Sequence, residues 1–177
     1  MTTALTIEPV WAGETVAVLG NAPCLDAELE YLPRPIHAIA CNQAVIKAPW
    51  VDMMVSIDAN WRLEADGYQG VRIIGFESPD IDACFLPIRY EEVVIGPAHT
   101  IHIRSNLLAA IRIAAQAGAA KVLLVGIDPE FYEANLQAPG TVAGLAALIV
   151  EMTTAGVVVE RFRIPDDARS AADVGAD

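Results

Sequence analysis

Short apolar runs recur along the chain, and most of them are separated by segments in which apolar residues have helical spacing. The runs are rich in Val, Ile, Leu and Ala and hold few polar residues, which is typical of strands buried on both faces. They cover residues 14–20, 36–41, 52–58, 71–76, 121–128 and 157–162. Strands that alternate with helices fold into a parallel sheet covered by helices on both sides. The sequence therefore predicts an α/β protein, a three-layer Rossmann-like domain with a mainly parallel sheet.

Two helices are predicted from local signals. The first begins at Pro23, because proline is favoured at the first helical position. Its apolar face is Leu25, Leu29 and Leu32, and its polar face is Asp26, Glu28 and Glu30. The second follows Ser105, a good N-cap, and ends at Gly118. Residues 43–48 predict at most one helical turn, and residues 59–66 predict a short helix that carries Trp61.

A third helix is predicted from Thr141 to Ala155, and it is apolar on most sides. Its predicted core stripe is Val142, Leu145, Ala146, Ile149 and Met152. Leu148 and Val150 lie outside this stripe, so the helix is either deeply buried or in contact with another subunit. We therefore expect a homo-oligomer formed through this helix. Residues 77–104 predict an irregular connection with one strand near 92–96, and residues 129–140 predict a loop.

The composition limits the class of protein. A chain of 177 residues that is 54% hydrophobic can bury one core, so a single domain is expected over residues 1–165, followed by a polar tail at 166–177. The net charge is −12, from 23 acidic and 11 basic residues, and no basic stripe offsets it. Nucleic acid is not an expected partner, because binding to a phosphate backbone needs clustered Lys and Arg.

The chain also lacks the patterns of exported and membrane proteins. Its first residues do not read as a signal peptide, and no apolar run approaches the roughly 20 residues of a membrane helix. We therefore expect no membrane partner and a cytoplasmic location. The three cysteines, Cys24, Cys41 and Cys84, form no C-x-x-C pair. They are interpreted as reduced and structural, and a zinc site is not expected.

Small polar residues gather where the predicted strands end. In an open parallel sheet the ligand site lies outside the carboxyl ends of the strands. The residues at these ends and at the start of the second helix are Gly20, Asn21, Asn42, Asp58, Asp128, Ser105 and Asn106. Each also has a structural explanation, since Asn favours turns and Ser and Asp cap helices. Asp58 and Asp128 are candidate ligands for Mg²⁺ together with substrate phosphates.

Other catalytic and cofactor patterns are weak. His37 lies inside a predicted strand, and His99 and His102 have no matching carboxylate motif. Cys24 beside a helix start is a weak candidate for a thiol of lowered pKa. The turn after the first strand reads Gly20-Asn-Ala-Pro-Cys24, without the second and third glycines of a G-x-G-x-x-G loop. NAD binding of the usual kind is therefore disfavoured.

Three ordered motifs nevertheless resemble a known group. Val16-Ala-Val-Leu-Gly-Asn-Ala-Pro-Cys-Leu25 resembles the G-N-G-P-S-L turn of the bacterial family 42 sialyltransferases and of related proteins that include archaeal-type 6-hydroxymethylpterin diphosphokinases. Ala40-Cys-Asn-Gln43 is similar to their R-C-N-Q. Arg104-Ser-Asn106, followed by Leu123-Leu-Val-Gly-Ile-Asp128 and Phe131-Tyr132, resembles their T-S-G helix and G-I-D-F-Y strand end. The resemblance implies a Rossmann-like fold in which Asn21, Asn42 and Ser105 contact a nucleotide.

The chain departs from that pattern at positions that bear on activity. The second glycine of the turn is Ala22, its serine is Cys24, and the glycine after Ser105 is Asn106. The family's catalytic histidine lies downstream of the G-I-D strand, and this chain has no histidine after His102. Tyr132 or Glu133 would have to supply the general base. The chain looks closest to compact phage-type members, which would place it in the cytoplasm of a host.

Two functions follow as expectations. The first is a nucleotide-dependent glycosyl- or diphosphotransferase-like enzyme. Its nucleotide or phosphate would be bound by Gly20, Asn21, Ala22, Asn42, Ser105 and Asn106. Asp58 and Asp128 would hold Mg²⁺, and the candidate catalytic residues are Asp58, Asp128 and Tyr132. The alternative is a catalytically inactive phage-type binding or assembly module with the same fold.

Overall fold

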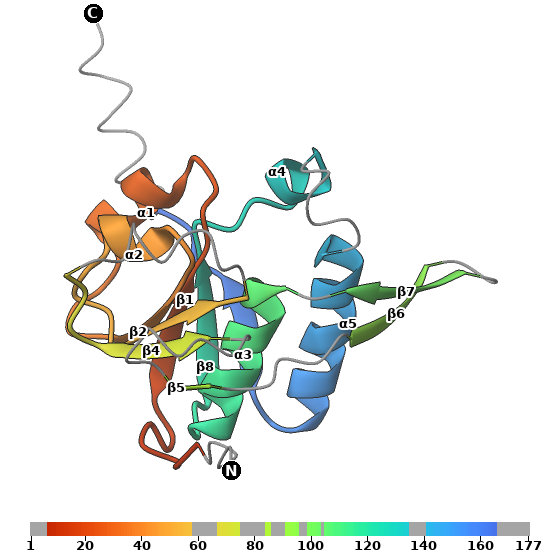
Figure 1. Ribbon diagram of the computed structural model, residues 1–177, viewed down its shortest axis with the longest axis horizontal. Coiled ribbons are helices and arrows are strands. Elements are labelled where there is room, and N and C mark those ends of the chain that lie inside the picture. The colour runs from red at the N-terminus through yellow and green to blue at the C-terminus, as the bar shows by residue number, and fades with distance from the viewer. Residues whose placement is uncertain are drawn as a thin grey trace, which may run out of the picture.

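The computed structural model describes residues 7–57, 67–74, 84–85, 91–95, 99–103, 105–134 and 141–165 (Figure 1). Strands and helices alternate along most of the chain. The strands are β1 (Thr15–Leu19), β2 (His37–Cys41), β3 (Met53–Ser56), β4 (Val71–Ile74), β5 (Cys84–Phe85), β6 (Glu91–Ile95), β7 (His99–Ile103), β8 (Lys121–Val125) and β9 (Val158–Arg161). The helices are α1 (Leu25–Tyr31), α2 (Ala44–Lys47), α3 (Asn106–Gln116), α4 (Pro129–Ala134) and α5 (Thr141–Thr154).

The main sheet has the strand order β5-β4-β3-β2-β1-β8-β9, and every pairing in it is parallel. Val18 of β1 pairs with Ile39 of β2 on one side and with Leu124 of β8 on the other. From β1 the chain moves outward to β5, then returns to β8 and moves outward in the opposite direction. The strand order therefore reverses at β1, and the predicted Rossmann-like α/β fold is confirmed.

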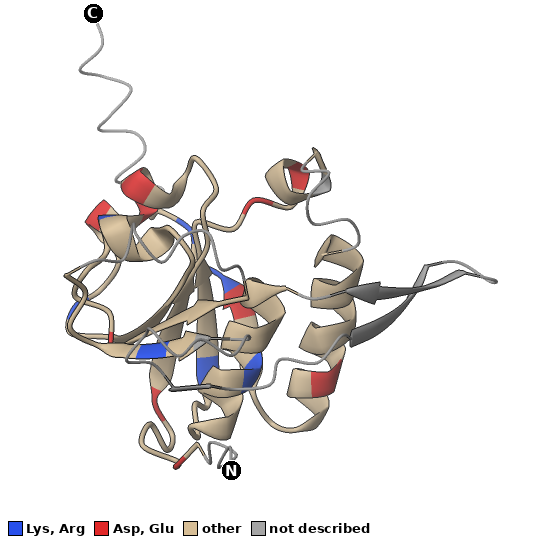
Figure 2. Cartoon of the chain, viewed as in Figure 1, with Lys and Arg blue, Asp and Glu red and all other residues tan. Residues whose placement is uncertain are grey.

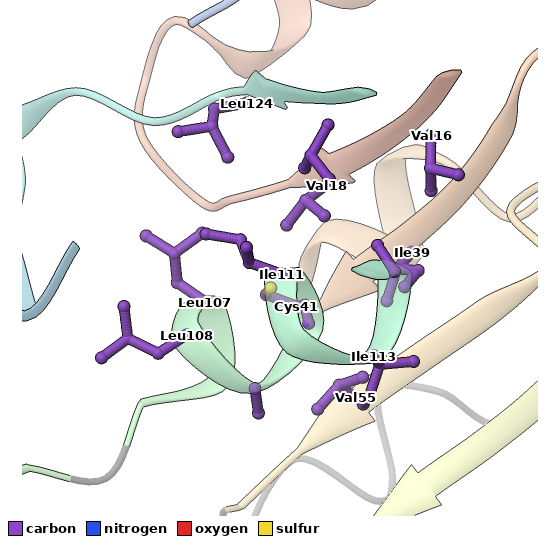
Figure 3. Packing of buried hydrophobic residues seen from close by; sticks show 14 of the residues in the cluster. Val16, Val18, Ile39, Cys41, Val55, Leu107, Leu108, Ile111, Ile113 and Leu124 are labelled. Atoms are coloured by element: carbon purple, nitrogen blue, oxygen red, sulfur yellow. The ribbon is translucent and has the colours of Figure 1, made fainter. Parts of the chain in front are cut away.

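The two faces of the sheet carry separate cores because successive side chains of a strand point to opposite faces. On one face Val16 and Val18 pack with α3 and α5, and Figure 3 shows Leu107, Leu108 and Ile111 of α3 against these strands. The other face joins Ala17, Leu19, Ala38, Ala40, Met54 and Val125 to residues of α1 and α2 such as Leu25 and Val45. The result is a three-layer arrangement of helix, sheet and helix.

Two predicted connections differ from the structure. Residues 91–95 (β6) pair antiparallel with residues 99–103 (β7), and β6 lies against α5 (Figure 1). Only one of these two strands was predicted, because each strand gains its hydrogen bonds from the other and prolines interrupt the flanking sequence. The loop predicted after Asp128 begins instead as α4. Asp128 accepts a hydrogen bond from the backbone N–H of Glu130 at 2.9 Å, and Pro129 takes the first helical position.

Helices α1 and α5 also correct details of the sequence prediction. Helix α1 begins at Leu25, so Pro23 lies in the preceding turn. The buried stripe of α5 is Thr141, Gly144, Leu145, Leu148 and Met152. Leu148 therefore belongs to the core, whereas Ala146 is exposed, because the helix turns a neighbouring face toward α3 and β9.

The predicted helix at 59–66 with Trp61 and the tail at 166–177 lie outside the described residues. Within the described ranges, no helix is both long and apolar enough to cross a bilayer.

Candidate functional site

The parallel sheet brings several predicted site residues to one edge. Gly20 and Asn21 follow β1, Asn42 follows β2, and Asp128 lies three residues beyond the end of β8. Carboxyl ends of parallel strands meet at the same edge, so these residues share it. Ser105 and Asn106 join them, because the side chain of Asn106 contacts the residue after β3. Asp58 lies outside the described residues, so its position relative to Asp128 is not described.

The turn after β1 is packed tightly against the end of β8. The N–H of Gly20 donates to the carbonyl of Val125 at 2.8 Å, and the N–H of Ala22 donates to the carbonyl of Gly126 at 2.9 Å. A Cβ at Gly20 would lie 2.5 Å from the Gly126 carbonyl oxygen. Ala22 is fully buried. Glycine at position 20 is therefore required by packing between β1 and β8.

Tyr132 reaches this turn from α4. The backbone N–H of Asn21 donates to the Tyr132 hydroxyl at 3.3 Å. Burial raises the pKa of Tyr132 to about 12, and the nearby Cys41 and Cys24 add to the effect. A phenol with that pKa stays protonated at neutral pH, so the Tyr132 hydroxyl is poorly suited to act as a general base. Glu133, the other substitute suggested for the base, has a side chain outside the described residues.

Glu28 carries a buried carboxylate, so its predicted place on the polar face of α1 is wrong. It is 5% exposed, and its Oε2 accepts a hydrogen bond from the backbone N–H of Gly126 at 2.7 Å. The guanidinium of Arg161 lies 3.9 Å from its Oε1. Position 28 falls between Leu25 and Leu32 on the same helical stripe, and that spacing was the available signal.

Cys24 and Cys41 do not have the properties of reactive thiols. Burial raises the pKa of the Cys24 thiol, and the neighbouring Glu28 carboxylate raises it further. The expectation of a lowered pKa at Cys24 is therefore wrong, because burial, and after it the Glu28 carboxylate, both disfavour the thiolate. Burial alone raises the pKa of Cys41 to about 12. Both cysteines are free thiols with structural positions.

Asn42 makes the turn between β2 and α2. Its backbone is left-handed, with φ of 48°, a conformation that asparagine tolerates better than most residues. Its N–H donates to the carbonyl of Val55 at 3.1 Å, and its own carbonyl accepts from Val45 at 3.3 Å. Asn42 is thus held at the carboxyl edge from β2 and β3 together.

Asn106 and Ser105 begin α3 beside the end of β3. The side-chain Oδ1 of Asn106 accepts a hydrogen bond from the backbone N–H of Ile57 at 2.7 Å. Ser105 occupies the N-cap position, as predicted, but its side chain makes no capping hydrogen bond. The positive end of the α3 dipole therefore points to this edge without a cap from the serine hydroxyl.

Asp128 supports the start of α4. Besides the hydrogen bond from its side chain to Glu130, its carbonyl accepts from the N–H of Tyr132 at 3.1 Å. The structural role suggested for this aspartate is therefore present. Among the residues that the structure describes, no group of three or more His, Cys, Asp and Glu side chains is arranged to hold a metal ion.

The charges around this edge are mainly negative. Figure 2 shows acidic residues on α1, at the end of β8 and on α4. Lys47 pairs with Asp26 at 2.5 Å, and Arg161 lies against Glu28. His37 is at the opposite edge, where β2 begins; its Nδ1 lies 3.2 Å from Asp52, and its ring stacks on Trp11.

The parallel sheet, its two helical layers and the polar residues at its strand ends define a Rossmann-like α/β protein. No protein-family model, curated protein or solved structure matches this chain.

Proposed function

We propose that this chain binds a nucleotide or another phosphate compound at the carboxyl edge of its sheet, across the ends of β8, β1, β2 and β3. The observation that carries this proposal is the reversal of strand order at β1. At such a reversal the two neighbouring connections leave on opposite faces of the sheet, which is where ligands of open α/β sheets bind. The resemblance of the motifs around Gly20, Asn42 and Ser105 to those of nucleotide-binding sialyltransferases supports the same site.

The start of α3 is the proposed contact for phosphate. It is an 11-residue helix whose N-cap serine makes no side-chain cap. Backbone N–H groups in the first turn of a helix and the positive end of its dipole favour anions. Asn106 is the first residue of this helix and Asn42 follows β2 at the same edge, and both carry amide groups of the kind that hydrogen-bond to sugars and bases. In this proposal Gly20 and Ala22 shape the turn, and Asn21 contributes its backbone N–H.

The acidic surroundings favour a cation bound with the ligand. Asp128 and Glu130 lie near the same edge and would repel a phosphate group in the absence of a counter-charge. Mg²⁺ is usually held by one or two carboxylates together with substrate phosphates. We therefore propose Asp128, with Asp58, as the carboxylates that would hold Mg²⁺.

Binding without turnover is the second candidate. The resemblance suggests glycosyl or diphosphoryl transfer, which requires a base to deprotonate the acceptor hydroxyl. The raised pKa of Tyr132 favours a catalytically inactive module, because Tyr132 is one of the two residues, with Glu133, that could substitute for the missing histidine. An inactive module would leave its ligand intact. A transferase with an acceptor would split a sugar nucleotide into the free nucleotide and a transferred sugar, or a nucleoside triphosphate into the monophosphate and a transferred diphosphate.

A thermal-shift screen tests the proposal. The probes are the mono-, di- and triphosphates of cytidine, uridine, adenosine and guanosine, each with and without Mg²⁺. A ligand at 100 times its dissociation constant adds about 2.7 kcal/mol to the free energy of unfolding. We expect at least one probe to raise the melting temperature, more strongly with Mg²⁺. Chromatography of the recovered nucleotide then separates binding from hydrolysis. The absence of any shift across the panel would contradict the proposal.

A further inference from the structure

The turn from Gly20 to Ala22 has three backbone N–H donors, and all of them already have partners. Gly20 and Ala22 donate to the carbonyl oxygens of Val125 and Gly126, so their hydrogen bonds connect the turn after β1 to the end of β8. Asn21 donates to a side chain instead, the hydroxyl of Tyr132. A ligand oxygen can therefore take over the N–H of Asn21 without breaking a backbone pairing, and at this turn it can do so only by displacing Tyr132.

The Tyr132 hydroxyl packs closely against Gly20, in addition to its hydrogen bond with Asn21. A Cβ added at Gly20 would lie 2.6 Å from the hydroxyl oxygen, so the missing side chain of Gly20 makes the room for it. Its bond to Asn21 is long, at 3.3 Å, which is beyond the usual range for N–H···O bonds. A phosphate oxygen makes a shorter, charge-assisted bond to a backbone N–H. The exchange therefore favours an anion once it reaches the turn.

We propose that Tyr132 is an autoinhibitory residue of the nucleotide site: its hydroxyl occupies the N–H of Asn21 in the empty protein and is displaced by a ligand phosphate oxygen. This inference rests on the proposed function and concerns the same site. Displacement moves the end of a side chain carried by α4, a six-residue helix that begins at Pro129, immediately after Asp128. The affinity for the ligand is then lower than that of the same site without the Tyr132 hydroxyl, because each ligand must first break the hydrogen bond between Tyr132 and Asn21.

The variant Tyr132→Phe tests the inference, because it removes the hydroxyl and keeps the ring. The probes are inorganic pyrophosphate and the diphosphates of cytidine, uridine, adenosine and guanosine, each with Mg²⁺, in calorimetric titrations. We expect the variant to bind the effective probe about two- to fivefold more tightly, because the empty state loses one long and therefore weak hydrogen bond. Tyr68→Phe is the matched control, since its hydroxyl donates to Val51 at 2.9 Å before β3, at the opposite edge.

Amide NMR supplies a second measurement, on the wild type and on both variants. The Asn21 resonance should shift on binding more than those of Gly20 and Ala22, whose carbonyl partners stay in place. Without ligand, hydrogen exchange at Asn21 should be faster in Tyr132→Phe than in the wild type or in Tyr68→Phe. Exchange at Asn21 that is the same in all three proteins would overturn the inference, and so would a larger ligand shift at Gly20.

The binding outcomes separate this inference from the proposed function. Equal or weaker binding by Tyr132→Phe, with a wild type that binds, overturns the autoinhibitory contact and leaves the nucleotide site standing. Binding by the variant alone supports both. Failure of both proteins to bind any probe removes the proposed function, and the inference falls with it.

Discussion

The carboxylate of Glu28 accepts a hydrogen bond from the backbone N–H of Gly126 at 2.7 Å, across 98 residues of sequence. This bond joins α1 to the end of β8, beside the point where the strand order reverses. Gly126 has a φ of 64°, and a Cβ there would lie 2.7 Å from the side chain of Leu25. The buried carboxylate of Glu28 and the close packing of Gly126 against Leu25 therefore together attach α1 to the end of β8, next to the proposed ligand site.

Removal of the Glu28 carboxylate should destabilise the fold. Glu28→Ala leaves the buried N–H of Gly126 without an acceptor, which costs about 1–3 kcal/mol of unfolding free energy. Glu28→Gln should cost less, because its amide oxygen can still accept the bond. Glu30→Ala, an exposed position on the same helix, should stay within about 0.5 kcal/mol of the wild type. Urea denaturation measures the unfolding free energy of all three variants. Equal losses in Glu28→Ala and Glu30→Ala would show that the Glu28–Gly126 hydrogen bond does not stabilise the fold.

Crowding at Gly126 can be separated from backbone strain. Gly126 and Gly156 both have positive φ, but a Cβ at Gly156 would meet nothing within 4 Å. Gly156→Ala should therefore cost about 1–2 kcal/mol, for the left-handed backbone alone. Gly126→Ala should cost about 1–3 kcal/mol more, because Leu25 must move. If thermal unfolding gives the two variants the same stability, the close contact with Leu25 is not maintained in solution.

Asn106 should hold the end of β3 in place. Asn106→Ala removes the acceptor for the Ile57 N–H, and we expect a loss of about 1–3 kcal/mol together with weaker nucleotide binding. Gln116→Ala, exposed at the other end of α3, is the control and should change neither property. Denaturation and calorimetric titration check the two effects. Full stability and full affinity in Asn106→Ala would show that this contact is dispensable.

Helix α5 is the proposed surface for self-association. Val150 is 68% exposed, and the neighbouring Ala146 and Ala147 are exposed with it. Burial of this strip against a second copy would remove apolar surface from water. We expect light scattering to give at least twice the mass of one chain, and Val150→Glu to give the mass of a single chain. A wild type that is monomeric at high concentration would remove this proposal.

The sequence predicted those parts of the structure that depend on local pattern. The apolar runs predicted β1, β2, β3, β4, β8 and β9. The ends of these runs predicted that Asn21, Asn42 and Asp128 lie at one edge of the sheet. The burial of Glu28 had a local signal in its helical spacing with Leu25 and Leu32, but its hydrogen-bond partner Gly126 was missed because it lies 98 residues away. The contact of Tyr132 with Asn21 was missed for the same reason, across 111 residues. Long-range pairs of this kind leave no periodic signal, so only the folded chain reveals them.

The most direct test of the nucleotide site is a ¹⁵N–¹H titration of the whole chain with the nucleotide that stabilises it most in the thermal-shift screen, in the presence of Mg²⁺. We expect amide shifts at the carboxyl edge, in Asn21, Asn42, Ile57 and Asn106, while the amides of His37 and Met53 at the opposite edge stay unchanged. Shifts confined to the edge of His37 and Met53, or no shifts at a saturating nucleotide concentration, would contradict the proposed site.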